Sequence, residues 1–179
     1  MKKYAPPIPL EKITAFVITG GSSGIGKTFI EVIRKLAPEA LVCNISRSKP
    51  ADFADSSQFL HIPADLTRPD DVESALQAAR EAIDARVPEG PLLLVNNSGF
   101  GKYGPFPHPD TGSHLAMVDL NIRACVHLAG GLLPDIRRRG GGILNVASTA
   151  AFQPTPCLAT YGATKAFLLH WSPPLSYDL

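Results

Sequence analysis

The fold is decided by residues 13–26, which read Ile-Thr-Ala-Phe-Val-Ile-Thr-Gly-Gly-Ser-Ser-Gly-Ile-Gly. A short and nearly continuous apolar run leads into a glycine-rich turn, and apolar residues then recur at helical spacing as far as Leu36. Pro38 cannot continue a helix, so the helix should end before it. The pattern predicts a buried strand, a tight turn and a helix, which together form one half of a βαβ unit.

The glycine-rich turn has the chemistry of a nucleotide-binding loop. Gly20, Gly24 and Gly26 allow a tight turn and let the backbone approach a ligand closely. The N-terminus of the following helix presents unpaired N–H groups and the positive end of its dipole to a pyrophosphate. A plain strand-to-helix connection is the alternative, and the position of the turn between a strand and a helix favours a nucleotide.

Further apolar runs follow along the chain, and helical periodicity separates most of them. The runs cover residues 40–46, 58–63, 91–97 and 143–147. We expect helices over 69–86 and 112–139 and a last helix that carries Tyr161. The apolar positions of the 112–139 helix are Leu115, Val118, Ile122, Val126 and Leu133. Such continuous runs are typical of parallel strands covered on both faces. Five strands alternating with helices predict one α/β domain over residues 13–179, with a doubly wound parallel sheet that binds ligands beyond the carboxyl ends of its strands.

Polar residues stand at these expected carboxyl ends. Arg47 follows the second run, where an acidic residue would bind the ribose hydroxyls of NAD and an arginine suits the 2′-phosphate of NADP. Asp65, followed by Leu66, comes after the third run, where it could meet the adenine. Asn97 and Ser148 end the fourth and fifth runs. Two alternatives stay open, because Arg47 could be a solvated loop residue and Asp65 a turn or cap residue.

Tyr161 and Lys165 form a candidate proton-transfer pair. They are four residues apart, so on a helix they share one face a single turn from each other. An ammonium beside a phenol favours the phenolate, so the phenol can give or take a proton near neutral pH. Ser148 could hydrogen-bond the same substrate oxygen. The spacing alone also fits an ordinary amphipathic helix with a surface Tyr–Lys pair.

Composition argues against several classes of function. The chain has 179 residues, 45% of them hydrophobic, and a formal net charge of +1. It has no basic stripe of the kind that binds nucleic acid, and the run Arg137–Arg139 lies near an expected helix end, where it complements the dipole. Cys43, Cys125 and Cys157 are odd in number and far apart, which predicts neither a disulfide framework nor a metal site.

The beginning of the chain and its hydropathy predict a cytoplasmic protein. Residues 1–12 are Pro-rich and are expected to form a loose arm, with positive charge but without the apolar stretch of a signal peptide. The chain contains no apolar run of the roughly 18 residues that a transmembrane helix needs, so no membrane contact is expected.

With these motifs in order, the chain resembles a short-chain dehydrogenase/reductase from about residue 13 to its C-terminus. The stretch Thr19–Gly26 is similar to the family's Thr-Gly-x3-Gly-x-Gly cofactor loop. Asp65-Leu66 is similar to its adenine-contacting acid motif, and Asn96–Gly99 to its Asn-Asn-Ala-Gly, with Ser98 in place of alanine. The residues that resemble the catalytic tetrad are Asn121, Ser148, Tyr161 and Lys165.

The resemblance implies a Rossmann-like fold and hydride transfer between NAD(P)(H) and a carbonyl or secondary alcohol of a small molecule, with NADP(H) preferred over NAD(H). Tyr161 would be the general acid in reduction and the general base in oxidation. Lys165 would assist Tyr161 and bind the nicotinamide ribose, and Ser148 would orient the substrate oxygen. Asn121 would hold a water that links Lys165 to solvent.

The resemblance also implies a set of cofactor contacts and an assembly. The implied cofactor-binding residues are Gly20, Ser22, Ser23, Gly24, Ile25, Gly26, Arg47, Asp65, Leu66, Asn97, Gly99, Tyr161 and Lys165. No metal is implied. The helices that carry Asn121 and Tyr161 form the usual dimer surface of the family, so a homodimer or homotetramer is expected.

The chain is shorter than the family pattern. Family members usually have two more strands after the Tyr–Lys helix, and Pro173-Pro174 should break that helix near Trp171 or Ser172. We therefore expect the fifth strand to be an exposed edge and the protein to be marginally stable or dependent on self-association. The alternative to an enzyme is a truncated relative that binds nucleotide or dimerises without turnover.

Overall fold

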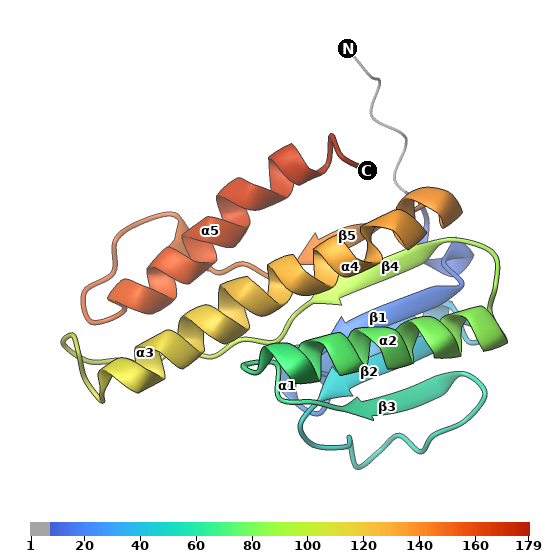
Figure 1. Cartoon of the computed structure of the whole chain (residues 1–179), viewed down its shortest axis with the longest axis horizontal. Helices are drawn as coiled ribbons and strands as arrows, with labels where there is room; N and C mark the ends of the chain where they lie inside the picture. Colours follow the sequence, from blue (N-terminus) through green and yellow to red (C-terminus); the bar gives the residue numbers. More distant parts are fainter. Residues whose placement is uncertain (1–7) are drawn as a thin grey trace.

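The computed structural model describes residues 8–179, and its central element is a five-stranded parallel sheet (Figure 1). Its strands are β1 (Ala15–Thr19), β2 (Leu41–Ser46), β3 (Phe59–Pro63), β4 (Leu92–Asn96) and β5 (Gly141–Asn145). They pair in the order β3-β2-β1-β4-β5, so the order reverses at β1. The prediction of a doubly wound α/β sheet with five strands is confirmed.

Helices connect the strands as predicted, except that a loop without a helix joins β2 to β3. The main helices are α1 (Gly24–Leu36), α2 (Pro69–Arg86), α3 (Thr111–Val118), α4 (Ala124–Arg139) and α5 (Ala159–Leu175). Short 3-10 turns are η1 (Leu10–Lys12) and η3 (Thr149–Ala151). Residues 1–7 of the predicted Pro-rich arm lie outside the described part of the chain, and its last residues form η1.

Strands β1 and β2 are buried on both faces, which explains their continuous apolar runs. Phe16 and Ile18 of β1 pack on one face against Ile30 and Ile33 of α1. Val17 faces the opposite way, into a cluster formed with α2 and α4. Figure 1 shows α2 and α4 lying across that second face. A buried parallel strand needs apolar side chains on both sides, so alternation is lost from its sequence.

The predicted 112–139 helix runs without interruption from Thr111 to Arg139, but it contains a π-helical segment, η2 (Asp119–Arg123). Three of its predicted apolar positions are exposed: Leu115 by 60%, Val118 by 37% and Val126 by 42%. The buried face instead carries His114, Met117, Asn121, Ala124, Cys125, Leu128, Ala129, Leu132 and Ile136. Polar and small residues occupy much of this face, so hydrophobicity alone does not identify it.

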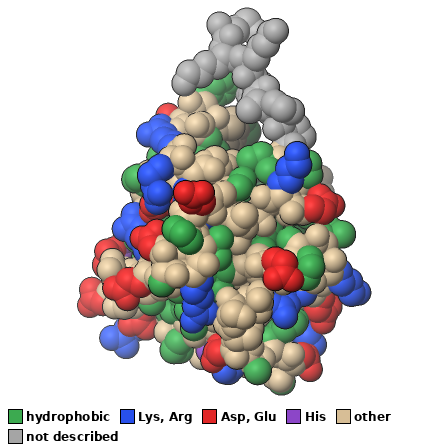
Figure 2. Space-filling model, turned by 90° about the vertical axis from the view of Figure 1, so that its right-hand side faces the viewer, with side chains coloured by type: hydrophobic (Ala, Val, Ile, Leu, Met, Phe, Trp, Pro, Cys, Tyr) green, Lys and Arg blue, Asp and Glu red, His purple; other side chains and the backbone are tan. Residues whose placement is uncertain are grey.

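The same long helix is apolar enough, by length and composition, to cross a membrane. A core helix passes the same test, and this one packs Leu128 and Leu132 into the cluster beneath α2. On the face shown in Figure 2, side chains of both charge signs are interspersed and neither sign gathers into one large patch. That surface lacks the basic stripe typical of nucleic-acid binding.

The expectation that Pro173 and Pro174 break the last helix near Trp171 or Ser172 is wrong, because α5 continues to Leu175. Both prolines lie in the final turn, and the fixed φ of proline fits a helix, although each proline lacks the N–H that would donate to the carbonyl four residues earlier. Ser172 also donates its hydroxyl proton to the carbonyl of Leu168 at 2.6 Å. The helix ends at Leu175, so only one further helical residue follows Pro174.

Strand β5 lies at one edge of the sheet formed by the described residues. Beside it an apolar groove of about 580 Å³ runs between α1 and the sheet. Ile25, Phe29 and Val32 of the α1 side face Leu93 and Leu144 of β4 and β5 across this groove. An uncovered groove next to an unpaired edge favours contact with another protein surface.

We expect the protein to self-associate through this edge. Leu144→Lys should weaken association about tenfold, because it places a charge where an apolar side chain would be buried. Sedimentation velocity over a concentration series measures the effect. Tyr103→Lys, at an exposed position of the loop after β4, is the matched control. A monomeric wild type with a cooperative, high-temperature melt, or weakening by Tyr103→Lys alone, would contradict the prediction.

Candidate functional site

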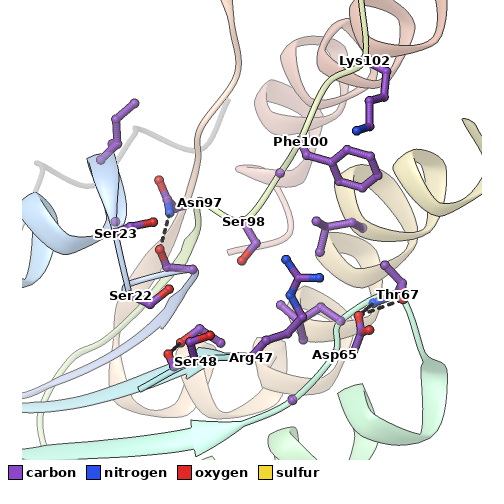
Figure 3. Close-up of a pocket in the computed structure, with 18 residues that line it drawn as sticks. Ser22, Ser23, Arg47, Ser48, Asp65, Thr67, Asn97, Ser98, Phe100 and Lys102 are labelled. Carbon is purple, nitrogen blue, oxygen red and sulfur yellow. Dashed lines mark hydrogen bonds between the residues drawn. The ribbon is translucent and has the colours of Figure 1, made fainter. Parts of the chain in front are cut away.

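A cleft of about 670 Å³ lies at the carboxyl edge of the sheet, where the connections that follow β1 and β4 leave it (Figure 3). Its walls come from the loops after β1, β2, β3 and β4, together with Leu120 of the long helix. The predicted cofactor residues that line it are Gly20, Ser22, Ser23, Ile25, Gly26, Arg47, Asp65, Leu66, Asn97 and Gly99. Gly24 instead lines the apolar groove on the far side of the glycine loop.

The glycine loop requires glycine where its backbone folds back on itself. Gly20 has a φ of +72°, which side chains of L-residues rarely adopt, and its N–H donates to the carbonyl of Ile45 at 2.9 Å. A Cβ on Gly26 would lie 2.3 Å from the carbonyl oxygen of Gly20. The absence of a side chain at Gly26 therefore lets the start of α1 approach the loop, which leaves the helix N-terminus open to the cleft.

Thr19 and Asn97 join the loops of β1 and β4 at the floor of the cleft. The Thr19 hydroxyl accepts hydrogen bonds from the backbone N–H groups of Asn97 and Ser98, at 3.0 and 2.9 Å. The Asn97 side chain also donates to the carbonyl of Thr19 at 2.9 Å and, at 3.4 Å, to the carbonyl of Gly20, and Figure 3 shows the second of these bonds. Thr19 was not among the predicted site residues, although it stands at the carboxyl end of the first strand.

Arg47 and Asp65 lie on the adenosine side of the cleft expected from the sequence. Figure 3 shows the Arg47 guanidinium extending into the cleft, with Asp65 and Thr67 beyond it. Asp65 accepts hydrogen bonds from the N–H and the hydroxyl of Thr67, at 3.0 and 2.8 Å. These bonds, and to a smaller extent the charge of Arg47, lower the pKa of Asp65. Asp65 is thus both a turn residue and part of the cleft wall.

Asn121 and Lys165 lie behind the cleft, and both are buried. The Asn121 side chain accepts from the N–H of Phe100 at 3.1 Å and donates to the carbonyl of Phe100 and the hydroxyl of Thr164, both at 3.0 Å. Lys165 is 4% exposed and donates from Nζ to the carbonyl of Val146 at 2.7 Å. A Cβ on Gly99 would lie 3.1 Å from Asn121 Oδ1 and 3.2 Å from Lys165 Nζ, so this pair directly abuts the cleft wall.

Burial lowers the pKa of the Lys165 side chain. Desolvation lowers the pKa of its ammonium from the ordinary value of 10.5, because moving a charge away from water disfavours the protonated form. Its Nζ lies 6.0 Å from the centre of the Tyr161 ring, which places the charge over the ring of the predicted proton donor. The geometry thus confirms that the two residues share one face of α5.

The Tyr161 ring packs against the loop that follows β4. A Cβ on Gly101 would lie 2.8 Å from this ring, so the loop passes directly beside the phenol. Ser148 caps η3, where its hydroxyl accepts from the N–H of Ala150 at 3.2 Å. The turn it begins lies against α5, since a Cβ on Gly162 would be 3.3 Å from the carbonyl of Ala150. Asn121, Ser148, Tyr161 and Lys165 therefore belong to one end of the sheet.

His114 joins the same region and was not predicted. Its Nε2 lies 3.1 Å from the carbonyl of His108, which requires a proton on Nε2, and its Nδ1 lies 2.8 Å from the hydroxyl of Thr160, next to Tyr161. The buried side chain thus ties the loop after β4 to the start of α5. The only signal in the sequence is its helical spacing to Met117 and Asn121.

Neither metal ligands nor disulfides were found at the site within residues 8–179. No group of three or more His, Cys, Asp or Glu side chains in that range could hold a metal ion. Cys43, Cys125 and Cys157 are free. Burial raises the pKa of Cys43 to about 12 and that of Cys125 to about 11, so both remain thiols near neutral pH.

Known proteins are similar to this chain in sequence and fold. Residues 14–179 match the family model of the short chain dehydrogenases. Hydroxysteroid dehydrogenase-like protein 1 from Gallus gallus is 31% identical over 172 residues, which cover 90% of this chain and 50% of that protein. A very-long-chain 3-oxoacyl-CoA reductase from Anas platyrhynchos is 29% identical over 167 residues, which cover 87% of this chain and 52% of that protein.

A solved structure also resembles this chain in its three-dimensional fold. The short-chain dehydrogenase from Sphingobium yanoikuyae in complex with NADPH superposes with a TM-score of 0.78 and 32% identity. The match covers 93% of this chain and 66% of that one. The chain spans about half the length of the two curated relatives.

Lys165→Met should stabilise the folded protein by about 1 kcal/mol at pH 7, because it removes a desolvated charge. The folded-state pKa of Lys165 lies below its unfolded value of 10.5, so the charge penalty is fully present below the folded pKa. The penalty disappears as the pH rises from that value to 10.5, and the difference between the proteins should shrink in this window. Urea unfolding at several pH values measures this, with the exposed Lys102→Met as control. A difference that does not change with pH would contradict the prediction.

Proposed function

The chain belongs to the short-chain dehydrogenase family, and from its site we propose that it transfers hydride between NADPH and a carbonyl or secondary alcohol. The observation that carries this proposal is the shared wall at Gly99. On one side of it lies a cleft with the glycine loop and Arg47, and on the other lie Asn121 and Lys165. A dinucleotide in the cleft would therefore reach the proton-transfer group with its nicotinamide end.

Tyr161, Lys165 and Ser148 have separate roles in the proposed proton transfer. NADPH supplies the hydride when it is bound. Tyr161 gives its hydroxyl proton to the carbonyl oxygen in reduction and takes it back in oxidation. The ammonium of Lys165 stabilises the phenolate that remains and binds the nicotinamide ribose. Ser148 donates a hydrogen bond to the same substrate oxygen and stabilises its developing charge.

Asn121 keeps the lysine connected to solvent in this proposal. Both protons of its amide nitrogen are used, by the carbonyl of Phe100 and the hydroxyl of Thr164. Its oxygen accepts one hydrogen bond, from the N–H of Phe100, and keeps a second lone pair for a water beside Lys165. That water would return a proton to Tyr161 through Lys165 after each turnover.

The end of the cleft at β2 supports a preference for NADPH over NADH. Ser22, Ser46, Arg47 and Ser48 line this end, and none of them is a carboxylate that would bind the ribose hydroxyls of NADH. An arginine with nearby hydroxyls suits a 2′-phosphate. The Sphingobium yanoikuyae relative was solved with NADPH, which agrees with this preference.

Other expectations remain proposals. We propose a small-molecule substrate, a cytoplasmic protein and a homodimer or homotetramer formed by the helices that carry Asn121 and Tyr161. The exposed Leu115, Val118 and Val126 supply an apolar surface for such a dimer. Nucleotide binding or dimerisation without turnover is the alternative, and the names of the relatives, a reductase and a dehydrogenase-like protein, favour the enzyme.

Tyr161→Phe should lower the turnover of NADPH with a panel of ketones at least about a thousandfold, because it removes the acid. NADPH affinity should change less than about threefold, since the ring remains in place. Absorbance at 340 nm measures turnover and calorimetry measures binding. Phe152→Tyr, an exposed aromatic change on the neighbouring turn, is the control. Undiminished turnover in Tyr161→Phe would overturn the assignment of the acid.

Arg47→Ala should weaken NADPH binding about 10- to 100-fold and leave NADH binding nearly unchanged, because only NADPH carries the 2′-phosphate. Fluorescence titration with each nucleotide measures both affinities. Lys49→Ala is the matched control, because this nearby cation pairs with Asp55 at the surface. Preferential binding of NADH by the wild type would reverse the role given to Arg47, and binding of neither nucleotide would overturn the proposed enzyme.

A further inference from the structure

Strand β2 carries a polar side chain where its neighbours are apolar. Asn44 is fully buried and lies between Cys43 and Ile45, which are also fully buried. A buried amide is costly unless it is hydrogen-bonded, by about 1–3 kcal/mol on the scale of protein mutations. The hydrogen bonds of Asn44 therefore indicate what the side chain does.

Asn44 connects the glycine loop to the loop that follows β2. Its Oδ1 accepts from the N–H of Gly21 at 2.8 Å, and its Nδ2 donates to the hydroxyl of Ser46 at 2.9 Å. The Ser46 hydroxyl donates onward to the carbonyl of Ser48 at 2.9 Å. Asn44 Nδ2 also lies 3.4 Å from Nδ1 of His61 on β3. One buried side chain thus holds two loops that come from neighbouring strands.

The contact with the glycine loop is tight. A Cβ on Gly21 would lie 2.5 Å from Asn44 Oδ1 and 2.4 Å from Cδ1 of Ile30. Gly21 therefore sits directly on the amide, and the next residues, Ser22 and Ser23, line the cleft. The position of this cleft wall depends on the hydrogen bond from Gly21 to Asn44.

The two loops meet at one end of the cleft. Figure 3 shows Ser22, Ser48 and Arg47 at this end, with Ser22 contributed by the glycine loop and the other two by the loop after β2. A phosphate held there contacts donors from both loops. The spacing of the loops thus decides whether those donors can bind it together, since hydrogen-bond strength falls steeply with distance and angle.

We propose that Asn44 is a positioning residue for the 2′-phosphate end of the cofactor, because it fixes the glycine loop against the loop carrying Ser46, Arg47 and Ser48. This inference rests on the proposed function and adds to it a residue that does not line the cleft. Loss of Asn44 weakens NADPH binding more than NADH binding, since NADH has no phosphate at this position.

The test compares Asn44→Leu, of similar size and without hydrogen-bonding groups, with Cys43→Ala, which removes buried volume from the same strand without touching the network. Fluorescence titration gives the affinities of both full-length variants for NADPH and NADH, and thermal melts give their stabilities. The NADPH-to-NADH affinity ratio should fall about tenfold in Asn44→Leu and stay within about twofold of wild type in Cys43→Ala. Hydrogen exchange without nucleotide should show the Gly21 N–H less protected in Asn44→Leu alone.

Ser46→Ala is the second variant, and it removes the hydroxyl that accepts from Asn44 and donates to Ser48, while the hydrogen bond from Gly21 to Asn44 stays in place. Its affinity ratio should fall about threefold, which keeps the inference testable even where Asn44→Leu does not fold. An unchanged ratio, with both nucleotides bound, means a purely structural Asn44 and overturns the inference alone. A wild type that binds neither nucleotide overturns the proposed function together with this inference.

Discussion

The site depends on a close contact between β1 and β4 at the point where the strand order reverses. Neighbouring strands lie on either side of β1, and the connections from β1 and β4 leave a crevice at their carboxyl ends. Asn97 donates two hydrogen bonds to Thr19 across it, from its backbone N–H to the hydroxyl and from its side-chain amide to the carbonyl. The glycine loop is thereby held to the loop after β4, and these loops form facing walls of the cleft.

The same close packing continues from the cleft to the buried lysine. Gly99 has no side chain, so Asn121 and Lys165 come directly up to the cleft wall. This arrangement has an energetic cost, because Lys165 is buried and its pKa is lowered by desolvation. A buried cation whose hydrogen bond goes to a backbone carbonyl contributes little to the stability of the folded protein. The same cation is suited to assist a proton donor.

Two apolar surfaces of the described chain face solvent. One is the groove between α1 and the edge strand β5, and the other is the stripe of Leu115, Val118 and Val126 along α3 and α4. Burial of either surface against another protein would be favourable, because it removes apolar area from water. The stripe lies on the helix that carries Asn121, so a partner there would also brace the helix that supports the lysine.

The sequence by itself determined the strands, the order of the elements and the motifs at the strand ends, because apolar runs and glycine turns are local patterns. It also pointed to Arg47, Asp65, Tyr161 and Lys165. Tertiary structure decided which face of the long helix is buried, since His114 and Asn121 replace apolar residues there and Leu115 faces outward. It also decided that α5 passes through Pro173, because the position of a proline within a helix sets its effect. The roles of Thr19, Asn44 and His114 come from hydrogen bonds between residues distant in sequence, which spacing along the chain does not encode.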